Sequence, residues 1–173
     1  MCAVFGGVEN GLIYTGAHDG TLIAWNFETG AGKYQLSDND PTCCHKDYWE
    51  GIKLSKSVDK LLVLDGRADP KEKKLLSMTA DQWIRFWDLK DSKAPSFKFH
   101  CGHPKEDSLT AIAATKDNKT LVTGDTSGQM KVWDISKVLF EDQTTEKFFL
   151  EKFFIIAHRS VINTIQIVDD KRI

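Results

Sequence analysis

The stretch LVTGDTSGQMKVWDI, residues Leu121–Ile135, decides the fold because two earlier stretches repeat its pattern. These are YTGAHDGTLIAWNF (Tyr14–Phe27) and LSMTADQWIRFWDL (Leu76–Leu89). β-Branched and aromatic residues alternate on both sides of a turn rich in Gly, Asp and Ser. That alternation is typical of two antiparallel strands joined by a tight turn, so the sequence predicts three copies of one β-hairpin.

Three landmarks recur at fixed offsets in these stretches. Near its end each has a Trp followed by Asn or Asp, at Trp25, Trp87 and Trp133. A hydroxyl residue stands ten positions before each Trp, at Thr15, Ser77 and Thr123. Six positions before each Trp stand Asp19, Asp81 and, as a departure, Ser127. Such agreement indicates a true repeat rather than chance.

Further strands are predicted on both sides of each hairpin. Apolar residues spaced for an inner strand precede the hairpins, and outer strands follow at about Gly32–Leu36, Ser96–His100 and Phe148–Ile156. Four strands per unit is the pattern of a propeller blade. The prediction is an all-β, incomplete propeller with blades at 1–36, 58–100 and 108–156, an insertion at 37–57, and the first strand of a fourth blade at 161–168. Helical turns are expected only within Ser136–Lys147 or Asp47–Lys53.

The repeat resembles the WD40 family over nearly the whole chain. Besides the Trp-Asp pairs, the Gly-His landmark of that family appears as Gly102-His103 and, altered, as Ala157-His158. The resemblance implies a buried chain of hydrogen bonds in each blade, from the Trp to the hydroxyl, the His and the turn Asp. Its implied members are Thr15, Asp19, Trp25, Ser77, Asp81, Trp87, His103, Thr123, Trp133 and His158. No blade is expected to hold all four residue types. The His of the first would lie before Met1, no His stands just before Val58 in the second, and Ser127 replaces the Asp in the third.

Composition limits the classes of partner. The chain has 23 Lys and Arg against 25 Asp and Glu, a formal net charge of −2, so no basic surface for nucleic acid is expected. No apolar stretch approaches the roughly 20 residues of a membrane-spanning helix. Cys2, Cys43, Cys44 and Cys101 show no CxxC spacing, which favours reduced thiols in a cytoplasmic protein.

Catalytic and metal interpretations are weaker than structural ones. A hydroxyl, His and Asp together resemble a hydrolase triad, but geometry defines a triad and the family uses these groups structurally. Cys43-Cys44-His45 and His100-Cys101-Gly102-His103 contain zinc-ligand residue types without the usual paired spacing. No catalytic residue, metal site or cofactor is therefore predicted.

The ends of the repeat array predict open strand edges, which invite pairing with other material. We therefore expect the sequence to be part of a longer protein or of a propeller completed by other chains. The phrases ETGAGKYQLSDNDPTCC, TADQWIRFWDL and TGDTSGQMKVWDIS resemble those of large ciliary, axoneme-associated WD-repeat proteins. That resemblance implies a structural role in a cilium, within a microtubule-associated assembly.

The predicted function is a non-catalytic scaffold that binds other proteins. Aromatic residues outside the repeat pattern are the candidate contacts, because aromatics are enriched at interfaces: Tyr48, Trp49, Trp83, Phe149 and Phe153, within a run Phe148–Phe154 that could equally pack on its own blade. One alternative is a substrate receptor of a ubiquitin ligase, although Lys90 and Ser136 stand where such receptors often carry Arg. Another alternative is an enzyme that uses the central channel of the propeller.

Overall fold

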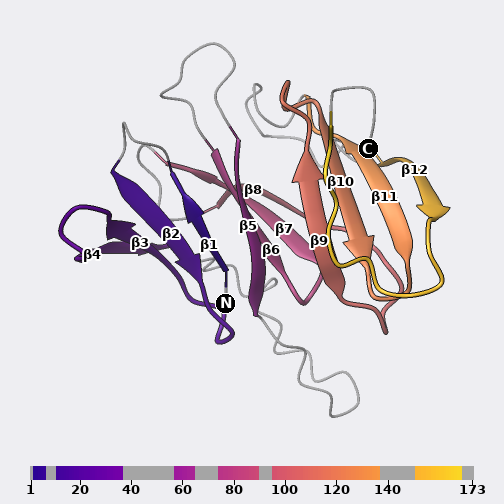
Figure 1. The fold of residues 1–173 in the computed structure, drawn as a ribbon, viewed down its shortest axis with the longest axis horizontal. Coiled ribbons are helices and arrows are strands. Elements are labelled where there is room, and N and C mark those ends of the chain that lie inside the picture. Colours follow the sequence, from indigo (N-terminus) through magenta and orange to yellow (C-terminus); the bar gives the residue numbers. More distant parts are fainter. Residues whose placement is uncertain are drawn as a thin grey trace.

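In the computed structural model, the described residues are 2–6, 11–36, 57–64, 74–89, 95–136 and 151–168. Their regular secondary structure consists of three four-stranded antiparallel sheets, which lie next to one another in chain order (Figure 1). The predicted all-β fold of three blades in an incomplete propeller is confirmed. Within the described residues, no helix is long and apolar enough to cross a membrane.

Each blade is a simple meander in which consecutive strands pair. Blade 1 contains β1 (Cys2–Phe5), β2 (Leu12–Gly16), β3 (Leu22–Asn26) and β4 (Gly32–Leu36). Blade 2 contains β5 (Val58–Leu64), β6 (Lys74–Thr79), β7 (Trp83–Asp88) and β8 (Pro95–His100). Blade 3 contains β9 (Leu109–Ala114), β10 (Thr120–Asp125), β11 (Gln129–Asp134) and β12 (Glu151–Ile156).

The tight turn between the second and third strands of each blade requires a left-handed backbone at the same repeat position. Gly20 and Gly128 fill it in blades 1 and 3, with φ of 85° and 89°. Blade 2 places Gln82 there, with φ of 66°, where a residue with a Cβ is strained. The strain is offset by side-chain hydrogen bonds, because Gln82 Nε2 donates to Pro104 O at 2.9 Å and to Asp107 O at 2.7 Å. Gln82 thereby ties the turn of blade 2 to the loop that enters blade 3.

Two hydrophobic cores join the blades, and each contains the Trp of the later blade. Trp87 packs with Tyr14 and Leu36 in the core between blades 1 and 2. Trp133 packs with Phe99 in the core between blades 2 and 3, with ring centroids 5.0 Å apart. Each Trp therefore faces the preceding blade, which explains why the landmark repeats.

All three tryptophans lie on the third strand of their blades, but their burial differs. Trp87 and Trp133 are only 3% and 4% exposed, whereas Trp25 is half-buried. The difference has a simple cause: no described blade covers the Trp25 face of blade 1. On blade 1, Phe5 and Phe27 remain 43% and 58% exposed and contact each other edge to face at 5.3 Å.

The segment predicted as the first strand of a fourth blade, residues 161–168, forms no strand in the structure. A β-strand is assigned by its backbone hydrogen bonds to a neighbouring strand, and no described strand pairs with this segment. Ile162 nevertheless holds the segment on blade 3: its side chain is 6% exposed and its backbone N–H donates to Asp125 O at 3.0 Å. Figure 1 shows this part of the chain running along the face of blade 3.

Some predicted features lie outside the described residues. They include Tyr48, Trp49 and Phe149, the insertion 37–57 except its last residue, Ser57, and the segments in which helical turns were expected, apart from Ser136.

Candidate functional site

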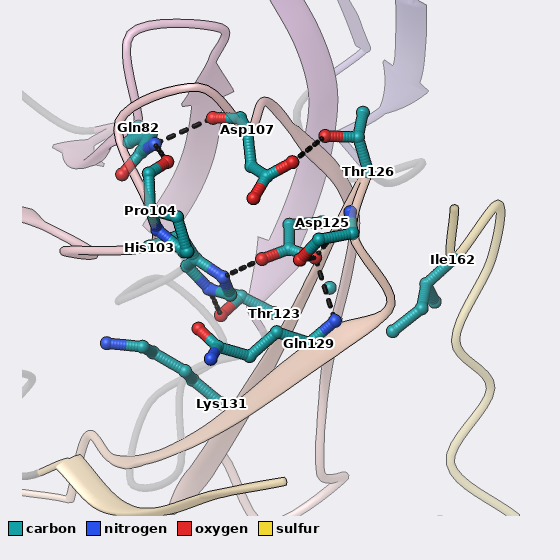
Figure 2. A network of polar contacts seen from close by, with 12 residues as sticks. Gln82, His103, Pro104, Asp107, Thr123, Asp125, Thr126, Gln129, Lys131 and Ile162 are labelled. Carbon is teal, nitrogen blue, oxygen red and sulfur yellow. Dashed lines mark hydrogen bonds and ion pairs between the residues drawn. The ribbon is translucent and has the colours of Figure 1, made fainter. Parts of the chain in front are cut away.

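A chain of buried hydrogen bonds runs through blade 3 (Figure 2). Trp133 Nε1 donates to Thr123 Oγ1 at 3.0 Å, and Thr123 Oγ1 lies 3.0 Å from His103 Nε2. His103 Nδ1 lies 2.6 Å from Asp125 Oδ2. One arrangement of protons satisfies every contact: Thr123 donates to Nε2, and the Nδ1–H of a neutral imidazole donates to the carboxylate. The network connects β10 and β11 to the loop that precedes β9.

The carboxylate of this network comes from Asp125, which the sequence analysis did not assign. The prediction that Ser127 replaces the Asp and that no blade holds all four residue types is therefore wrong for blade 3. Asp125 lies at the end of β10, where the register with β9 shifts between Gly124 and Asp125. Its Oδ1 accepts from Ser127 N at 3.0 Å, Ser127 Oγ at 2.8 Å and Gln129 N at 2.8 Å. Ser127 therefore supports the carboxylate instead of substituting for it.

The electrostatics agree with a neutral imidazole beside an ionised carboxylate. Burial lowers the pKa of His103, and this outweighs the opposing effect of its hydrogen bond to Asp125. Burial raises the pKa of Asp125, but hydrogen bonds from His103, Ser127 and Gln129 outweigh it and hold that pKa below its usual value. The pair is thus fully hydrogen-bonded at neutral pH.

The same geometry argues against a hydrolase triad or a zinc site. The Thr123 side chain is completely buried and already engages Trp133 and His103, so a substrate cannot reach its oxygen. Both ring nitrogens of His103 are occupied, which leaves none for a metal. In the described part of the chain, no group of three or more His, Cys, Asp or Glu residues is placed to hold a metal ion.

Blade 1 contains the Trp–hydroxyl bond, and no other described residue continues it. Trp25 Nε1 donates to Thr15 Oγ1 at 2.7 Å. Asp19 is exposed in the turn, where its Oδ1 accepts from Thr21 N and Thr21 Oγ1 at 2.9 and 2.7 Å. These bonds from Thr21 hold the pKa of Asp19 below its usual value. Asp19 therefore shapes its turn and does not join Thr15.

Blade 2 keeps the Trp–hydroxyl bond and builds a different polar cluster in its turn. Trp87 Nε1 donates to Ser77 Oγ at 2.8 Å. Asp81 is 5% exposed and accepts a hydrogen bond from Thr79 Oγ1, which in turn accepts from Arg85 Nη1 at 2.8 Å. Arg85 Nη2 lies 3.8 Å from Asp81 Oδ2, an oxygen that accepts no hydrogen bond from the described residues. In blade 2 the guanidinium of Arg85 thus lies beside the carboxylate of Asp81, where blade 3 has the imidazole of His103 beside Asp125.

His158 does not join a network among the described residues. It is exposed, and its backbone N–H donates to Gly128 O at 3.2 Å. The predicted network role of His158 is not tested by the described residues and stays a prediction.

Trp83, a candidate partner contact, is half-buried at the start of β7. Its ring meets His100 edge to face at 5.6 Å, and the Arg85 guanidinium lies 6.0 Å from the ring centroid. Much of its surface thus contacts blade 2 itself.

The outer strand of blade 3, β12, is exposed at all six residues. Its register with β11 places Phe153 and Ile155 opposite Val132 and Met130, and Phe154 and Ile156 opposite Lys131 and Gln129. Opposed residues share a face of the sheet, so the two pairs point to opposite sides. Phe153 lies on the side away from Trp133, and Phe154 on the side of Trp133 and Lys131.

In the other two blades, the positions equivalent to these two sides of β12 differ in polarity. The residues equivalent to Phe153 and Ile155 are Tyr34 and Leu36 in blade 1, and Phe97 and Phe99 in blade 2. All four pack in the cores between blades. The residues equivalent to Phe154 are Gln35 and Lys98, and the residue equivalent to Ile156 in blade 2 is His100. Of the three sheets, only that of blade 3 carries apolar residues at those positions. The sequence pattern did not show that Phe154 and Ile156 face the side opposite to Phe153.

Three consecutive four-stranded meanders, the second and third each with a Trp packed on the blade before it, define the chain as part of a β-propeller. Residues 95–134, which span β8 to β11, match the family model "WD domain, G-beta repeat". That match supports the WD40 family; the narrower likeness to ciliary proteins receives no support from the comparisons. Among curated proteins, none matches the chain.

Similarity to a solved structure extends beyond the matched repeat. The chain resembles the crystal structure of the computationally designed Ika8 protein, with 21% identity and a TM-score of 0.62. The alignment covers 97% of this chain and 40% of that one. At this identity the similarity concerns the fold alone.

Proposed function

We propose that this chain is a non-catalytic scaffold that binds other proteins through the rim strand β12. The observation that carries the proposal is the pair Phe154 and Ile156, which are 57% and 75% exposed on the side of β12 where the other blades carry polar residues. We call Phe154 and Ile156 the rim pair.

Exposed apolar side chains on an edge strand are costly for a soluble protein, because such edges promote pairing with other chains. The β8 edge of blade 2 begins with Pro95 and carries Lys98, two features that discourage added strands. β12 has a Lys only near its start, and Lys152 lies 3.8 Å from Asp134. The rim pair thus lacks the protection that the equivalent edge of blade 2 retains.

The sequence hypothesis placed the partner contact at Phe149 and Phe153. Phe149 lies outside the described residues. Phe153 is 50% exposed, but it belongs to the side of the blade that packs between blades elsewhere in the chain. The rim contact is therefore proposed at Phe154 and Ile156.

A non-catalytic role is supported by the burial of Thr123, since this hydroxyl, which lies beside an imidazole as a nucleophile would, is closed to substrate. The finer proposal is a cytoplasmic scaffold of a cilium or axoneme, in a microtubule-associated assembly. Its support is the resemblance of the three sequence phrases to axoneme-associated WD-repeat proteins. Localisation of the tagged chain in ciliated cells tests it; a diffuse distribution without enrichment in the cilium would contradict it.

The rim contact is tested with the double variant Phe154→Ser/Ile156→Ser. Covering two such side chains stabilises a complex by several kcal/mol at about 25 cal/mol per Å² of apolar area, so partner recovery should fall by more than about tenfold. Phe27→Ser is the matched control, because Phe27 is 58% exposed on blade 1, away from β12. The measurement is quantitative co-precipitation of cross-linked partners, with thermal melts to confirm folding. Equal recovery from the double variant and the wild type would remove the proposed contact.

A further inference from the structure

Gln82 occupies a turn position at which blade 3 has no room for a side chain. The equivalent residue of blade 3 is Gly128, five residues before the Trp of its blade, and a Cβ there would meet His158 O at 2.2 Å. The backbone contact is common to both turns, because Cys101 N donates to Gln82 O and Ala157 N donates to Gly128 O, each at 2.9 Å. The side chain of Gln82 is therefore an addition to a contact that both blades make through the backbone.

The loop that enters blade 3 directs two backbone carbonyls at this side chain. We call residues 101–108 the entry loop. Gln82 Nε2 donates to Pro104 O at 2.9 Å and to Asp107 O at 2.7 Å, so both acceptors belong to the entry loop. Gln82 Oε1 is buried and accepts no hydrogen bond from the described residues. Both bonds therefore depend on the NH2 group of the amide, since a carbonyl can only accept.

The entry loop is also held from the side of blade 3. Asp107 Oδ1 accepts from Thr126 Oγ1 at 2.7 Å, and Thr126 N donates to Ser108 O at 3.1 Å. Figure 2 shows the resulting polar path from Gln82 through Asp107 to Thr126. The entry loop thus joins the β6–β7 turn of blade 2 to the β10–β11 turn of blade 3.

The entry loop carries the imidazole of the blade 3 network. His103 is 3% exposed, and the residue directly after it, Pro104, is one of the two that Gln82 holds. Gln82 in turn keeps a φ of 66°, which costs free energy in a residue with a Cβ and persists only where the surroundings stabilise it. The turn and the entry loop therefore stabilise each other.

We propose that Gln82 is a positioning residue that makes the β6–β7 turn and the entry loop open and close as one unit, together with the His103 network. In blade 1 the equivalent residue is Gly20, which has no side chain to reach the next blade. The turn of blade 1 therefore opens independently of blade 2. This coupling does not depend on the rim pair, so its failure would leave the scaffold proposal unaffected.

Native-state hydrogen exchange of the full chain tests the coupling. Gln82→Gly removes the NH2 group and relieves the positive φ, so the fold is retained. The exchange rates of the Asp107 and Thr126 amides should rise together by about tenfold, because two hydrogen bonds to the entry loop are lost. Asn118→Ala is the matched control and should leave both rates unchanged. Asn118 is the other described non-Gly residue with a positive φ, 54°, and lies in the β9–β10 turn, at the opposite end of β9. Unchanged rates in Gln82→Gly, or an equal rise in all three sheets, would overturn the proposal.

A second variant separates hydrogen bonding from packing. Gln82→Glu retains the length of the side chain but places oxygen where the NH2 group donates, so neither carbonyl keeps a donor. The Asp107 and Thr126 amides should exchange at least as fast as in Gln82→Gly. Wild-type exchange rates in Gln82→Glu would show that packing holds the entry loop, and would overturn the role of the amide.

The titration of His103 gives a readout that a purely local role of Gln82 would not change. Burial lowers the pKa of His103, so a looser entry loop should bring that pKa closer to its ordinary value of 6.5. The charged groups that also act on the ring, Asp125, Lys131 and Glu151, are the same in the variant. NMR titration of the imidazole in the wild type and in Gln82→Gly measures the shift. An identical titration in the two proteins would separate the His103 network from Gln82 and contradict the proposal.

Discussion

Blades 2 and 3 share their strands and their Trp–hydroxyl bond, yet they satisfy the turn carboxylate in different ways. In blade 3, Asp125 receives a hydrogen bond from His103, which connects through Thr123 to Trp133. In blade 2, Asp81 lies beside Thr79 and Arg85, and Ser77 bonds to Trp87 without an imidazole among the described residues. The Trp–hydroxyl bond is therefore the element common to the blades, and the rest of the polar cluster is interchangeable.

The largest effect is expected when the imidazole of blade 3 is removed. His103→Ala leaves the buried carboxylate of Asp125 and the hydroxyl of Thr123 without their partner, which should cost about 3 kcal/mol of unfolding free energy. Urea denaturation measures it. His158→Ala is the control and should change stability by less than about 0.5 kcal/mol, because His158 is exposed. Similar losses in the two variants would mean that the network is not what stabilises blade 3.

The matching change in blade 2 should have a smaller effect. Ser77→Ala leaves the indole N–H of Trp87 buried without an acceptor, at a cost of about 1–2 kcal/mol. Among the described residues no imidazole contacts the hydroxyl of Ser77, so less is lost than in blade 3. Denaturation of both variants side by side makes the comparison; a Ser77→Ala cost above that of His103→Ala would reverse it.

Acid should weaken blade 3 through the same imidazole. The pKa of His103 is lowered in the folded state, so below the ordinary value of 6.5 the unfolded chain binds a proton that the folded chain does not. Stability is then fully present above pH 6.5 and falls as the pH is lowered below it, by at most about 1.4 kcal/mol per pH unit. Denaturation at pH 7, 6 and 5 tests this, with His103→Gln as the control whose profile should be flatter. An equal slope in both would assign the effect to other groups.

The smallest effect is expected at the strained turn of blade 2. Gln82→Gly relieves the positive φ but loses the hydrogen bonds to Pro104 and Asp107, so the two contributions nearly cancel, with a net cost below about 1 kcal/mol. Gln82→Ala keeps the strain and loses the same bonds, so it should be less stable than the Gly variant. Melting temperatures of the two rank them; the opposite order would show that strain is negligible here.

The fold was accessible from the sequence because its signals are local and repeated. Every blade has a Trp with a hydroxyl residue ten positions before it, as Trp133 and Thr123 show in blade 3. That spacing places both side chains on the same face of a hairpin. Asp125 was missed because the comparison fixed the carboxylate six residues before the Trp, whereas blade 3 carries it eight residues before, at a register shift that no repeat pattern encodes. The sequence also could not predict which side of the sheet Phe153 and Phe154 face, since in a run of four apolar residues no alternation marks the covered side. Only the register with β11 assigns them.

Asp125 also has two roles that meet in one residue. Its side chain binds His103, and its backbone carbonyl accepts the hydrogen bond from Ile162 that holds residues 161–168 on blade 3. In blade 1 the equivalent carbonyl belongs to Ala17, which has no side-chain network behind it. If protonation of His103 shifts Asp125, thermodynamic linkage requires that the proton and any ligand sensitive to the position of residues 161–168 change each other's affinity by the same factor. Blade 3 thus places an ionisable pair, His103 and Asp125, at the residue whose carbonyl holds the following segment, whereas blade 1 has Ala17 at the equivalent position.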